Sequence, residues 1–541
     1  MASPFTHAVA SFDPTADAVL LWTRAPGAGP LRWTVAGDAD LTDVVGTGLV
    51  DPDPERDHTA VVDVSGLEPA TTYFYGFSAA GQRSPVGRTR TLPAAGADHV
   101  RLGLVSCARF SVAPLGVYRA VAEREVDLVL HLGDYIYEDD GSSGPRSHEP
   151  PHPARSRSDY RRRIAQVRAD PDAQALHLRH PMVAILDDHD VADNCWSTGA
   201  KHHDDASDGP FAARAAAATE ARQEWLPQRL RDASDPRTTW RSVELGDLAE
   251  LLLLDTRLSG RDQHAGDDGT KPLRDPTRSL LGDEQRQWMD ERLADGDRPW
   301  TLLATGVVVN EVGLPAPAVP GIGHLLPNGY ALVDREVLHD DQWDGYPHER
   351  AHLVEQLAAR RDAGGRTVIL SADIHSSWAF EGPCDDDGRA VAVEMTVPAV
   401  ASAPMGRGRL PGAWRLLDAA VRRLEHVPWA DVTRRGYGVV DLTRERALLE
   451  WWFVEPTDED PGRSQWLGAA WEARRADWPP QLREVEATAD PVRAARRDDL
   501  PPRPGDLARI RRNHRVRLVA ERTSGVALAM GALAALAHRR R

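Results

Sequence analysis

The sequence contains very little lysine, little cysteine and no long hydrophobic run. Lysine occurs at two of the 541 positions, Lys201 and Lys271, so arginine supplies almost all of the positive charge. Three cysteines cannot form a framework of disulfide bonds. The longest apolar stretch, 524–537, is shorter than the roughly 20 residues that a membrane-spanning helix needs. The N-terminus has no basic stretch followed by an apolar one, so we expect no signal peptide and a cytoplasmic location.

The negative charge of the chain is distributed unevenly. The net charge is −17, but residues 491–541 hold thirteen arginines against four carboxylates, a net charge of +9. The other residues therefore carry −26, which argues against a nucleic-acid partner because an acidic surface repels a phosphate backbone. We expect the basic tail to be a solvated helix; the alternative is that it contacts the acidic body or an anionic membrane surface.

The composition predicts a soluble chain of several domains, expected to be a monomer. Residues 1–95 are predicted to form a β-sandwich, because apolar and β-branched runs recur between turn residues. Tyr73 follows Leu67-Glu68-Pro69 in a pattern similar to the tyrosine corner of fibronectin type III domains. The predicted strands lie at 18–25, 30–37, 59–66, 71–79 and 86–92.

From residue 96 the pattern changes to short continuous apolar runs with helical segments between them, such as 116–125 and 284–294. Such runs are typical of strands buried on both faces of a sheet in an α/β fold. We therefore predict a mixed α/β (α+β) chain with a catalytic domain over 96–460. A helical, arginine-rich extension is expected over 461–541.

Polar residues follow five of the predicted strands at the point where each strand ends. Because ligands bind at the carboxyl ends of strands in open α/β sheets, these residues are expected to share one site. They are Cys107, Asp134, the run Asp187-Asp188-His189-Asp190, the run Asp255-Thr256-Arg257, and Asp373-Ile374-His375.

These residue types indicate a metal centre. Oxygen and nitrogen donors of this kind suit a pair of ions that bind the attacking and leaving oxygens of a displacement. Tyr135 and Tyr137 follow Asp134 closely, and a phenolate binds best to a strongly Lewis-acidic ion such as Fe(III). Cys107 is either a soft donor or a small buried hydrophobe. The donor set is Asp134, Asp188, His189, Asn194, Asp373 and His375.

The order of motifs along the chain resembles that of the PhoD-type alkaline phosphatases, a branch of the calcineurin-like metallophosphoesterases. The similarity covers most of residues 5–454, and Asp190 stands where the family more commonly has glutamate. The motifs that carry it are LLWTR, VSCARF, HLGDYIYE, DDHDVADN, LLLDTR, DQWDGYPHERAHL, SADIHSSW and RRGYGVVDLT.

The resemblance implies a fibronectin-like N-terminal domain and a four-layer catalytic domain with two stacked sheets flanked by helices. It implies hydrolysis of phosphate monoesters or diesters by a water activated at an Fe(III)/Ca(II)-type centre, with other divalent ions able to take the second position. Relatives of this kind are commonly exported.

The resemblance also assigns roles to individual residues. Cys107 stands where the family replaces its usual first Asp-x-His metal motif with cysteine. Tyr137 matches the iron-bound tyrosinate, and Asp134 matches the carboxylate shared by both ions. Asp373 and His375 match the closing ligands, while Asp188 and Asn194 both remain candidates. His189 is expected to protonate the leaving oxygen or orient the phosphate. Arg257 is expected to contact the phosphate or a ligand; the alternative is a buried ion pair with Asp255.

Two other functions remain open at this stage. One is hydrolysis of a related ester, such as a phospholipid or a phosphonate. The other is an inactive member of the fold that binds a partner through its β-sandwich, although a decayed site has no reason to keep its ligands. The segment 141–158 is expected to be a disordered loop or a lid, and its histidines, like His202 and His203, are expected to be solvated.

Overall fold

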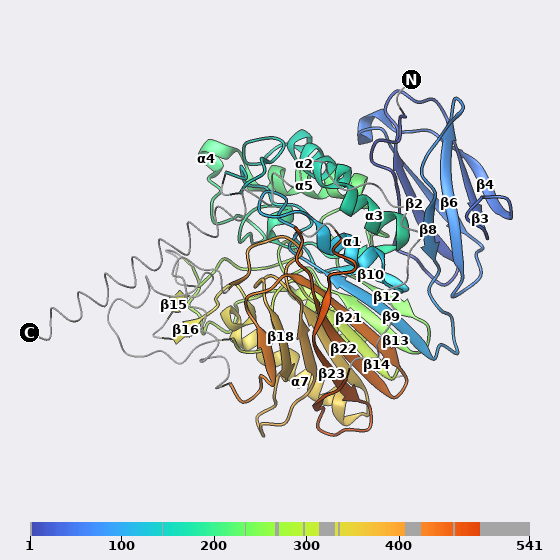
Figure 1. Cartoon of the computed structure of the whole chain (residues 1–541). Helices are drawn as coiled ribbons and strands as arrows, with labels where there is room; N and C mark the ends of the chain where they lie inside the picture. The colour runs from blue at the N-terminus through green and yellow to red at the C-terminus, as the bar shows by residue number, and fades with distance from the viewer. Residues whose placement is uncertain are drawn as a thin grey trace, which may run out of the picture.

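The computed structural model describes residues 3–142, 144–232, 234–265, 270–295, 298–312, 331–333, 336–405, 424–457 and 460–486. These residues form a mixed α/β fold built around two large sheets, with a further small sheet at the N-terminal end (Figure 1). The arginine-rich segment 491–541 lies outside the described residues. Within them, no helix is both long enough and apolar enough to cross a membrane.

The larger sheet has ten strands and contains the first and the last strands of the described chain. Strands β9, β10, β11 and β1 run parallel to one another, and the remaining pairs are antiparallel. The order is β24 (Leu482–Glu484), β23 (Trp466–Arg474), β22 (Arg446–Phe453), β21 (Gly436–Thr443), β9 (His99–Val105), β10 (Leu128–His131), β11 (Met182–Ala184), β1 (Val9–Phe12), β2 (Ala18–Arg24) and β5 (Thr59–Ser65).

The second sheet has seven strands, of which β13, β14, β17 and β19 are parallel. The order is β12 (Arg241–Leu245), β13 (Ala249–Leu253), β14 (Trp300–Ala304), β17 (Arg366–Ser371), β19 (Val393–Thr396), β18 (Ser377–Glu381) and β20 (Trp429–Asp431). A separate hairpin pairs β15 (Ala331–Val333) with β16 (Glu336–Leu338).

The part of the chain that follows residue 96 has four layers. Apolar residues of both sheets share one buried cluster, which places the sheets face to face. Alternation along β13 shows why: Leu251 and Leu253 belong to that cluster, while Leu252 points to the opposite side and packs with α6 (Asp283–Ala294) and α7 (Pro347–Asp362). The other face of the ten-stranded sheet is covered by α1 (Gly116–Ala122), α2 (Arg157–Ala169), α3 (Pro171–Arg179) and α5 (Phe211–Trp225). A short helix, α4 (Asp205–Asp208), precedes α5.

The N-terminal segment forms two packed β layers, as predicted, but one of its layers is part of the larger sheet. Strands β4 (Val44–Val50), β3 (Leu31–Ala36), β6 (Thr72–Ala79), β7 (Gln82–Arg83) and β8 (Gly87–Arg90) form a separate sheet. Its partner layer is β1, β2 and β5, which continue the ten-stranded sheet because β1 pairs with β11. The tyrosine corner is present: the backbone N–H of Glu68 donates to Tyr73 Oη at 2.9 Å.

Two expectations from the sequence differ from the structure. Residues 461–486 are not helical, since β23 and β24 lie in this range and extend the ten-stranded sheet. The described residues of the 141–158 segment are held in place, not loose, because the carbonyls of Pro150 and His152 accept hydrogen bonds from the guanidinium of Arg163, and Arg146 donates to the carbonyl of Phe110. The side chains of His148 and His203 are buried, which corrects the expectation that both are solvated.

Candidate metal centre

The polar residues predicted from the strand ends do converge. Cys107, Asp134 and the run starting at Asp187 follow the parallel strands β9, β10 and β11, while Asp373 and His375 follow β17 of the second sheet. The candidate ligands form three overlapping groups, and within each group the ligand atoms lie within 4.8 Å of one another. Asp134 belongs to all three groups. The groups are Cys107–Asp134–His375, Asp134–Asp188–His189 and Asp134–Asp187–Asp188–Asp373.

The backbone at this site is held in an unusual conformation. Five of the residues predicted as ligands have a positive φ between 48° and 63°, a left-handed region that side chains other than glycine rarely adopt. Such conformations cost free energy and persist where the surrounding structure enforces them, which is typical of functional sites. The five are Cys107, Asp134, Asn194, Asp373 and His375.

Asp190 holds the loop that carries Asp134. Its carboxylate accepts backbone N–H groups from Asp134, Tyr135 and Ile136 at 3.0, 3.0 and 3.3 Å, and from Asp187 at 3.1 Å. Four N–H groups from two strand ends thus point at one carboxylate. This contact explains why an acidic side chain follows His189 in the motif.

One side of the site brings together sulfur, phenol and imidazole groups. Tyr137 Oη lies 3.0 Å from His375 Nε2 and 2.8 Å from Ser402 Oγ. Ser402 also donates its backbone N–H and its hydroxyl to the carbonyl of Cys107. Arg435 in turn donates to the carbonyl of Ser402 at 2.8 Å. Ser402 therefore fixes Cys107 and Tyr137 relative to each other.

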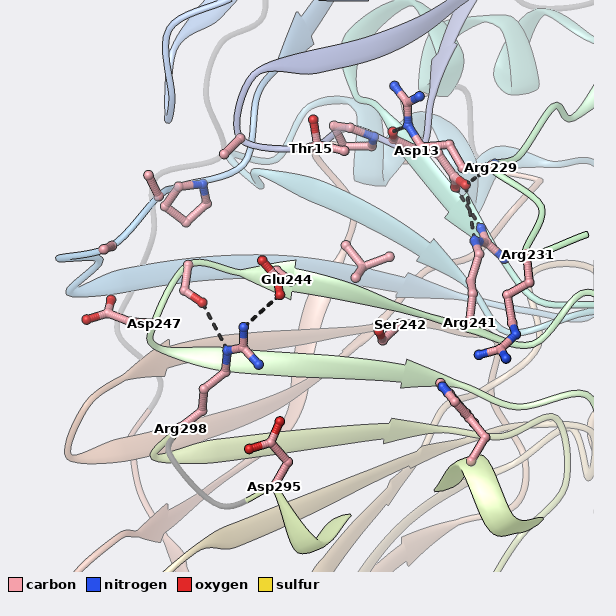
Figure 2. Close-up of a pocket in the computed structure, with 18 of the residues that line it drawn as sticks. Asp13, Thr15, Arg229, Arg231, Arg241, Ser242, Glu244, Asp247, Asp295 and Arg298 are labelled. Atoms are coloured by element: carbon pink, nitrogen blue, oxygen red, sulfur yellow. Dashed lines mark hydrogen bonds and ion pairs between the residues drawn. The ribbon is translucent and has the colours of Figure 1, made fainter. Parts of the chain in front are cut away.

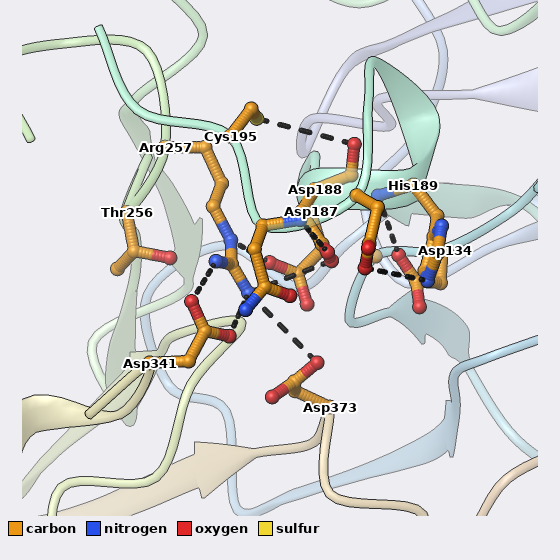
Figure 3. A network of polar contacts seen from close by, with 12 residues as sticks. Asp134, Asp187, Asp188, His189, Cys195, Thr256, Arg257, Asp341 and Asp373 are labelled. Atoms are coloured by element: carbon orange, nitrogen blue, oxygen red, sulfur yellow. Dashed lines mark hydrogen bonds and ion pairs between the residues drawn. The ribbon is translucent and has the colours of Figure 1, made fainter. Parts of the chain in front are cut away.

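The other side is a network of aspartates around Arg257 (Figure 3). The guanidinium of Arg257 is fully buried and contacts Asp187 at 2.5 Å and both oxygens of Asp341 at 2.7 and 3.0 Å. It also lies 3.5 Å from Asp188 and 3.8 Å from Asp373. The predicted alternative, an ion pair with Asp255, is not what is observed: Asp255 accepts the backbone N–H of Arg257 instead. Arg257 therefore contacts candidate ligands and does not reach the open pocket.

The charges in the site call for bound cations. Burial, reinforced by neighbouring carboxylates, raises the pKa of Asp134 and Asp373 well above the ordinary value. Burial likewise raises the pKa of the Cys107 thiol and the Tyr137 phenol well above their usual values. Asp134 Oδ2, Asp187 Oδ2 and Asp188 Oδ1 are buried and accept no hydrogen bond from any described residue. Metal ions fit this set, because they favour the ionised ligands and would satisfy these oxygens.

His189 lies beside the same carboxylates. Its Nδ1 is 2.7 Å from Glu138 Oε2, and its ring stacks 4.1 Å from that of Tyr137. Burial alone would lower the pKa of His189, but Asp188, Glu138 and Asp134 raise it well above 6.5. With Nδ1 held by Glu138, the Nε2 atom of the ring is the one that can face a substrate.

A pocket of about 670 Å³ opens onto these residues. Its lining includes Tyr137, Asp188, Asn194, Asp373 and His375. Asn194 lies next to Asp188, since its backbone N–H donates to Asp188 Oδ2 at 2.6 Å. The structure thus brings both candidates of the DDHDVADN motif to the same place.

A larger cavity of about 950 Å³ lies elsewhere, between the linker at 93–95 and strand β12 (Figure 2). Two ion pairs join charged groups of its lining: Arg241 with Asp13 at 2.7 Å, and Arg298 with Glu244 at 2.9 Å. The donor groups of the metal centre are absent from its lining. The chemistry therefore belongs to the smaller pocket.

Comparison with known proteins agrees with this geometry. The family model described as PhoD-like phosphatase matches residues 102–451, and the model of the PhoD-like phosphatase N-terminal domain matches residues 1–93. The chain belongs to the PhoD-like phosphatase family.

Individual relatives support the assignment. The chain is 34% identical over 405 residues to alkaline phosphatase D of Bacillus subtilis (strain 168). The aligned region covers 70% of this chain and 65% of the relative, which is just under two thirds of the relative's length. A solved structure described as that of PhoD superposes with a TM-score of 0.77 at 28% identity, covering 91% of this chain and 94% of the other. A purple acid phosphatase from yellow lupin, Lupinus luteus, has the same fold at 12% identity, with a TM-score of 0.51 and coverage of 83% and 72%.

Within this PhoD-like site, several residues were not predicted from the sequence. Asp187 was placed at the strand end but given no role, although it belongs to one of the metal-binding groups. Glu138, Asp341 and Gln342 were missed, and Gln342 Nε2 donates to Asp373 Oδ2 at 2.5 Å. The DQWDGYPHERAHL motif could have indicated Asp341 and Gln342, since they open it. Ser402 stands in an irregular segment with no local pattern to mark it.

Proposed function

We propose that this protein hydrolyses phosphate esters at a dinuclear Fe(III)/Ca(II)-type centre. The observation that carries the proposal is the set of buried carboxylate oxygens that converge around Asp134 beside an open pocket and accept no hydrogen bond from any described residue. Bound ions there would supply Lewis acidity to the phosphoryl group and a nucleophile derived from water. The relative named alkaline phosphatase D supports the same reaction class.

The geometry supports a division of the ligands between two positions. Cys107, Tyr137 and His375 lie together on one side of Asp134 and would hold the iron. Asp188, Asn194 and Asp373 lie on the other side, where oxygen donors suit calcium or another divalent ion. Asp134 is common to all three groups and would be shared by both ions.

Three further residues have roles that follow from their contacts. His189, oriented by Glu138, would donate a proton to the leaving oxygen from Nε2. Arg257 would keep Asp187, Asp188 and Asp373 in position from beneath the site. We assign Arg257 a positioning role because its guanidinium is fully buried.

The test combines metal content, colour and turnover. Purified protein loaded with iron and calcium should be violet, because a tyrosinate bound to Fe(III) absorbs visible light, and it should hydrolyse an aryl phosphate or the matching diester. Tyr137→Phe should abolish the colour, and Asp134→Asn should remove both metals and turnover. The matched control is Asp98→Asn, at a carboxylate that is 91% exposed. Retained iron and near-normal turnover in Asp134→Asn would contradict the shared-ligand assignment.

A further inference from the structure

We infer that Lys201 gives the pocket a second anion-binding point, so that the preferred substrates are phosphate esters whose leaving group carries a further negative charge. This inference rests on the proposed function, since it concerns the part of the substrate that is released. It concerns a side chain outside the metal-binding groups.

Lys201 lies on the wall of the pocket close to the metal centre. It lines the same cavity as Asn194 and Asp373, and it is exposed to solvent. Its backbone N–H donates to the carbonyl of Asp193 at 3.2 Å, and Asp193 directly precedes Asn194. The segment that carries the lysine is therefore tied to a candidate metal ligand.

The segment is also fixed from its other side. Trp196 N–H donates to the carbonyl of Gly199 at 2.8 Å, which closes a tight turn just before Lys201. Ser197 donates both its backbone N–H and its hydroxyl to the carbonyl of Arg261, at 3.1 and 2.9 Å. Arg261 contacts Asp341 in the network around Arg257. The Cα of Lys201 thus has a defined place, while its four-carbon stem leaves the ammonium free to reach a ligand.

The ion pairs of the pocket distinguish Lys201 from the other cations. The lysine and arginine side chains in the lining are Arg109, Arg155, Lys201 and Arg214. Arg109 pairs with Asp139, Arg155 pairs with Asp208 at 2.8 Å, and Arg214 is buried with its Nε 3.1 Å from Tyr160 Oη. Among the described residues, no carboxylate lies within 4 Å of the Lys201 ammonium. Asp193, whose backbone carbonyl accepts the Lys201 N–H, has its carboxylate 3.3 Å from His202, and the charge of Lys201 acts on it from a longer distance.

The other charged side chains at the rim of the pocket are largely acidic, which gives the positive charge of Lys201 its effect on anionic ligands. Glu138, Asp139, Asp140 and Asp193 line the pocket and repel additional negative charge. The metal centre neutralises the charge of one phosphoryl group. A second anionic group, on the leaving group, faces the side chains at the rim of the pocket instead. A cation there offsets the repulsion, and the effect weakens with salt because the site is exposed. We expect a preference of about tenfold, equivalent to about 1.4 kcal/mol.

The first experiment measures discrimination by the metal-loaded full chain. Turnover of phenyl phosphate and 4-carboxyphenyl phosphate, and of their methyl diesters, gives a ratio of kcat/KM values with and without the extra charge. Lys201→Gln should lower this ratio about tenfold, mainly through KM, and Lys201→Arg should restore it. Lys271→Gln is the matched control, since Lys271 pairs with Asp262 at 2.8 Å outside the pocket. An unchanged ratio in Lys201→Gln, or an equal fall in Lys271→Gln, overturns the inference.

The second experiment reads binding without turnover, so it separates this inference from the proposed function. The chain has two lysines, so reductive methylation followed by mass spectrometry reports on each one separately. Compared with phenylphosphonate, both 4-carboxyphenylphosphonate and 1,4-phenylenediphosphonate should slow the methylation of Lys201 but not that of Lys271. The probe that protects Lys201 more strongly shows whether a carboxylate or a phosphate group is the preferred charge. Equal rates with all three probes overturn the inference. Absence of turnover in the wild type, by contrast, would overturn the proposed function.

Discussion

Replacing Arg257 by methionine tests whether the aspartate network depends on one buried charge. The guanidinium is fully buried and makes three hydrogen bonds, one to Asp187 and two to Asp341. Methionine fills a similar volume but leaves Asp187 buried without a counter-charge, while Asp341 keeps its contact with Arg261. Removing one partner of a buried ion pair typically costs about 3–5 kcal/mol.

The size of the chain sets the expected change in melting temperature. An unfolding entropy of about 2.1 cal/mol/K per residue gives about 1.1 kcal/mol/K for this chain, so a loss of about 3–5 kcal/mol lowers Tm by about 3–4 °C. Scanning calorimetry of the chelated protein measures this change without contributions from metal binding. The matched control is Arg483→Met, since Arg483 forms an exposed ion pair with Asp477 and should shift Tm by less than about 1 °C.

A second substitution distinguishes lost charge balance from lost packing. Asp187→Asn in the Arg257→Met background removes the carboxylate left without a counter-charge, so the double variant should be more stable than the sum of the single effects predicts. Groups in direct contact typically show coupling of about 0.5–3 kcal/mol. If Arg257→Met melts within 1 °C of the wild type, or if the two effects simply add, the network does not depend on this charge.

Three further outcomes follow from the structure. Gly133→Ala should lower the free energy of unfolding by about 2–5 kcal/mol in urea titrations, because the added Cβ would lie 2.3 Å from the Cβ of Asp187. Gly364→Ala is the control: Gly364 has nearly the same φ, but its added Cβ would meet no atom within 4 Å, so this change should cost only the backbone strain of about 1–2 kcal/mol. Removing metal with a chelator should lower Tm, and restoring iron and calcium at about 100 times Kd should recover about 2.7 kcal/mol of stability. Despite burial, hydrogen bonds from His99 and Arg101 lower the pKa of Asp441 to about 2, while the bond to Asp441 raises the pKa of His99. The stability that ionised Asp441 contributes is lost as pH falls through about 2, and the stability that protonated His99 contributes is lost as pH rises through the folded pKa of His99. Asp441→Asn should therefore lower the free energy of unfolding by about 2 kcal/mol between about pH 4 and 6.5, and by less at higher pH. Tm measured across this pH range checks the prediction.

The site was largely predictable because it is built from strand ends. Asp134 and Asp373 each follow a continuous apolar run, and such runs mark strands whose carboxyl ends meet at one edge. Asp341 and Ser402 could not be found this way, since they stand in irregular segments whose position depends on tertiary contacts. The burial of Arg257 was also unpredictable, because its partner Asp341 is 84 residues away in the sequence.

The fold was predicted well locally and less well over long distances. The predicted strand at 71–79 agrees with β6, and the predicted helix at 284–294 with α6. Residues 466–474, WLGAAWEAR, lie in the extension that was expected to be helical over 461–541, yet pairing with β22 makes them a strand. Alanine has a weak preference that a neighbouring strand overrides. The link between β1 and β11 was missed since no local pattern reports which strands pair.

The pairing of β1 with β11 also sets an order of events during synthesis. Phe12 leaves the ribosome first, but its neighbour in the sheet, Met182, is made 170 residues later. At about 5–20 residues per second, β1 waits about 10–30 s for that neighbour. Until then the layer formed by β1, β2 and β5 has an open edge of unpaired backbone groups, the kind of surface that invites aggregation. The first 95 residues therefore cannot complete their fold ahead of the rest, and a nascent chain that stalls before β11 should be a preferred client of chaperones.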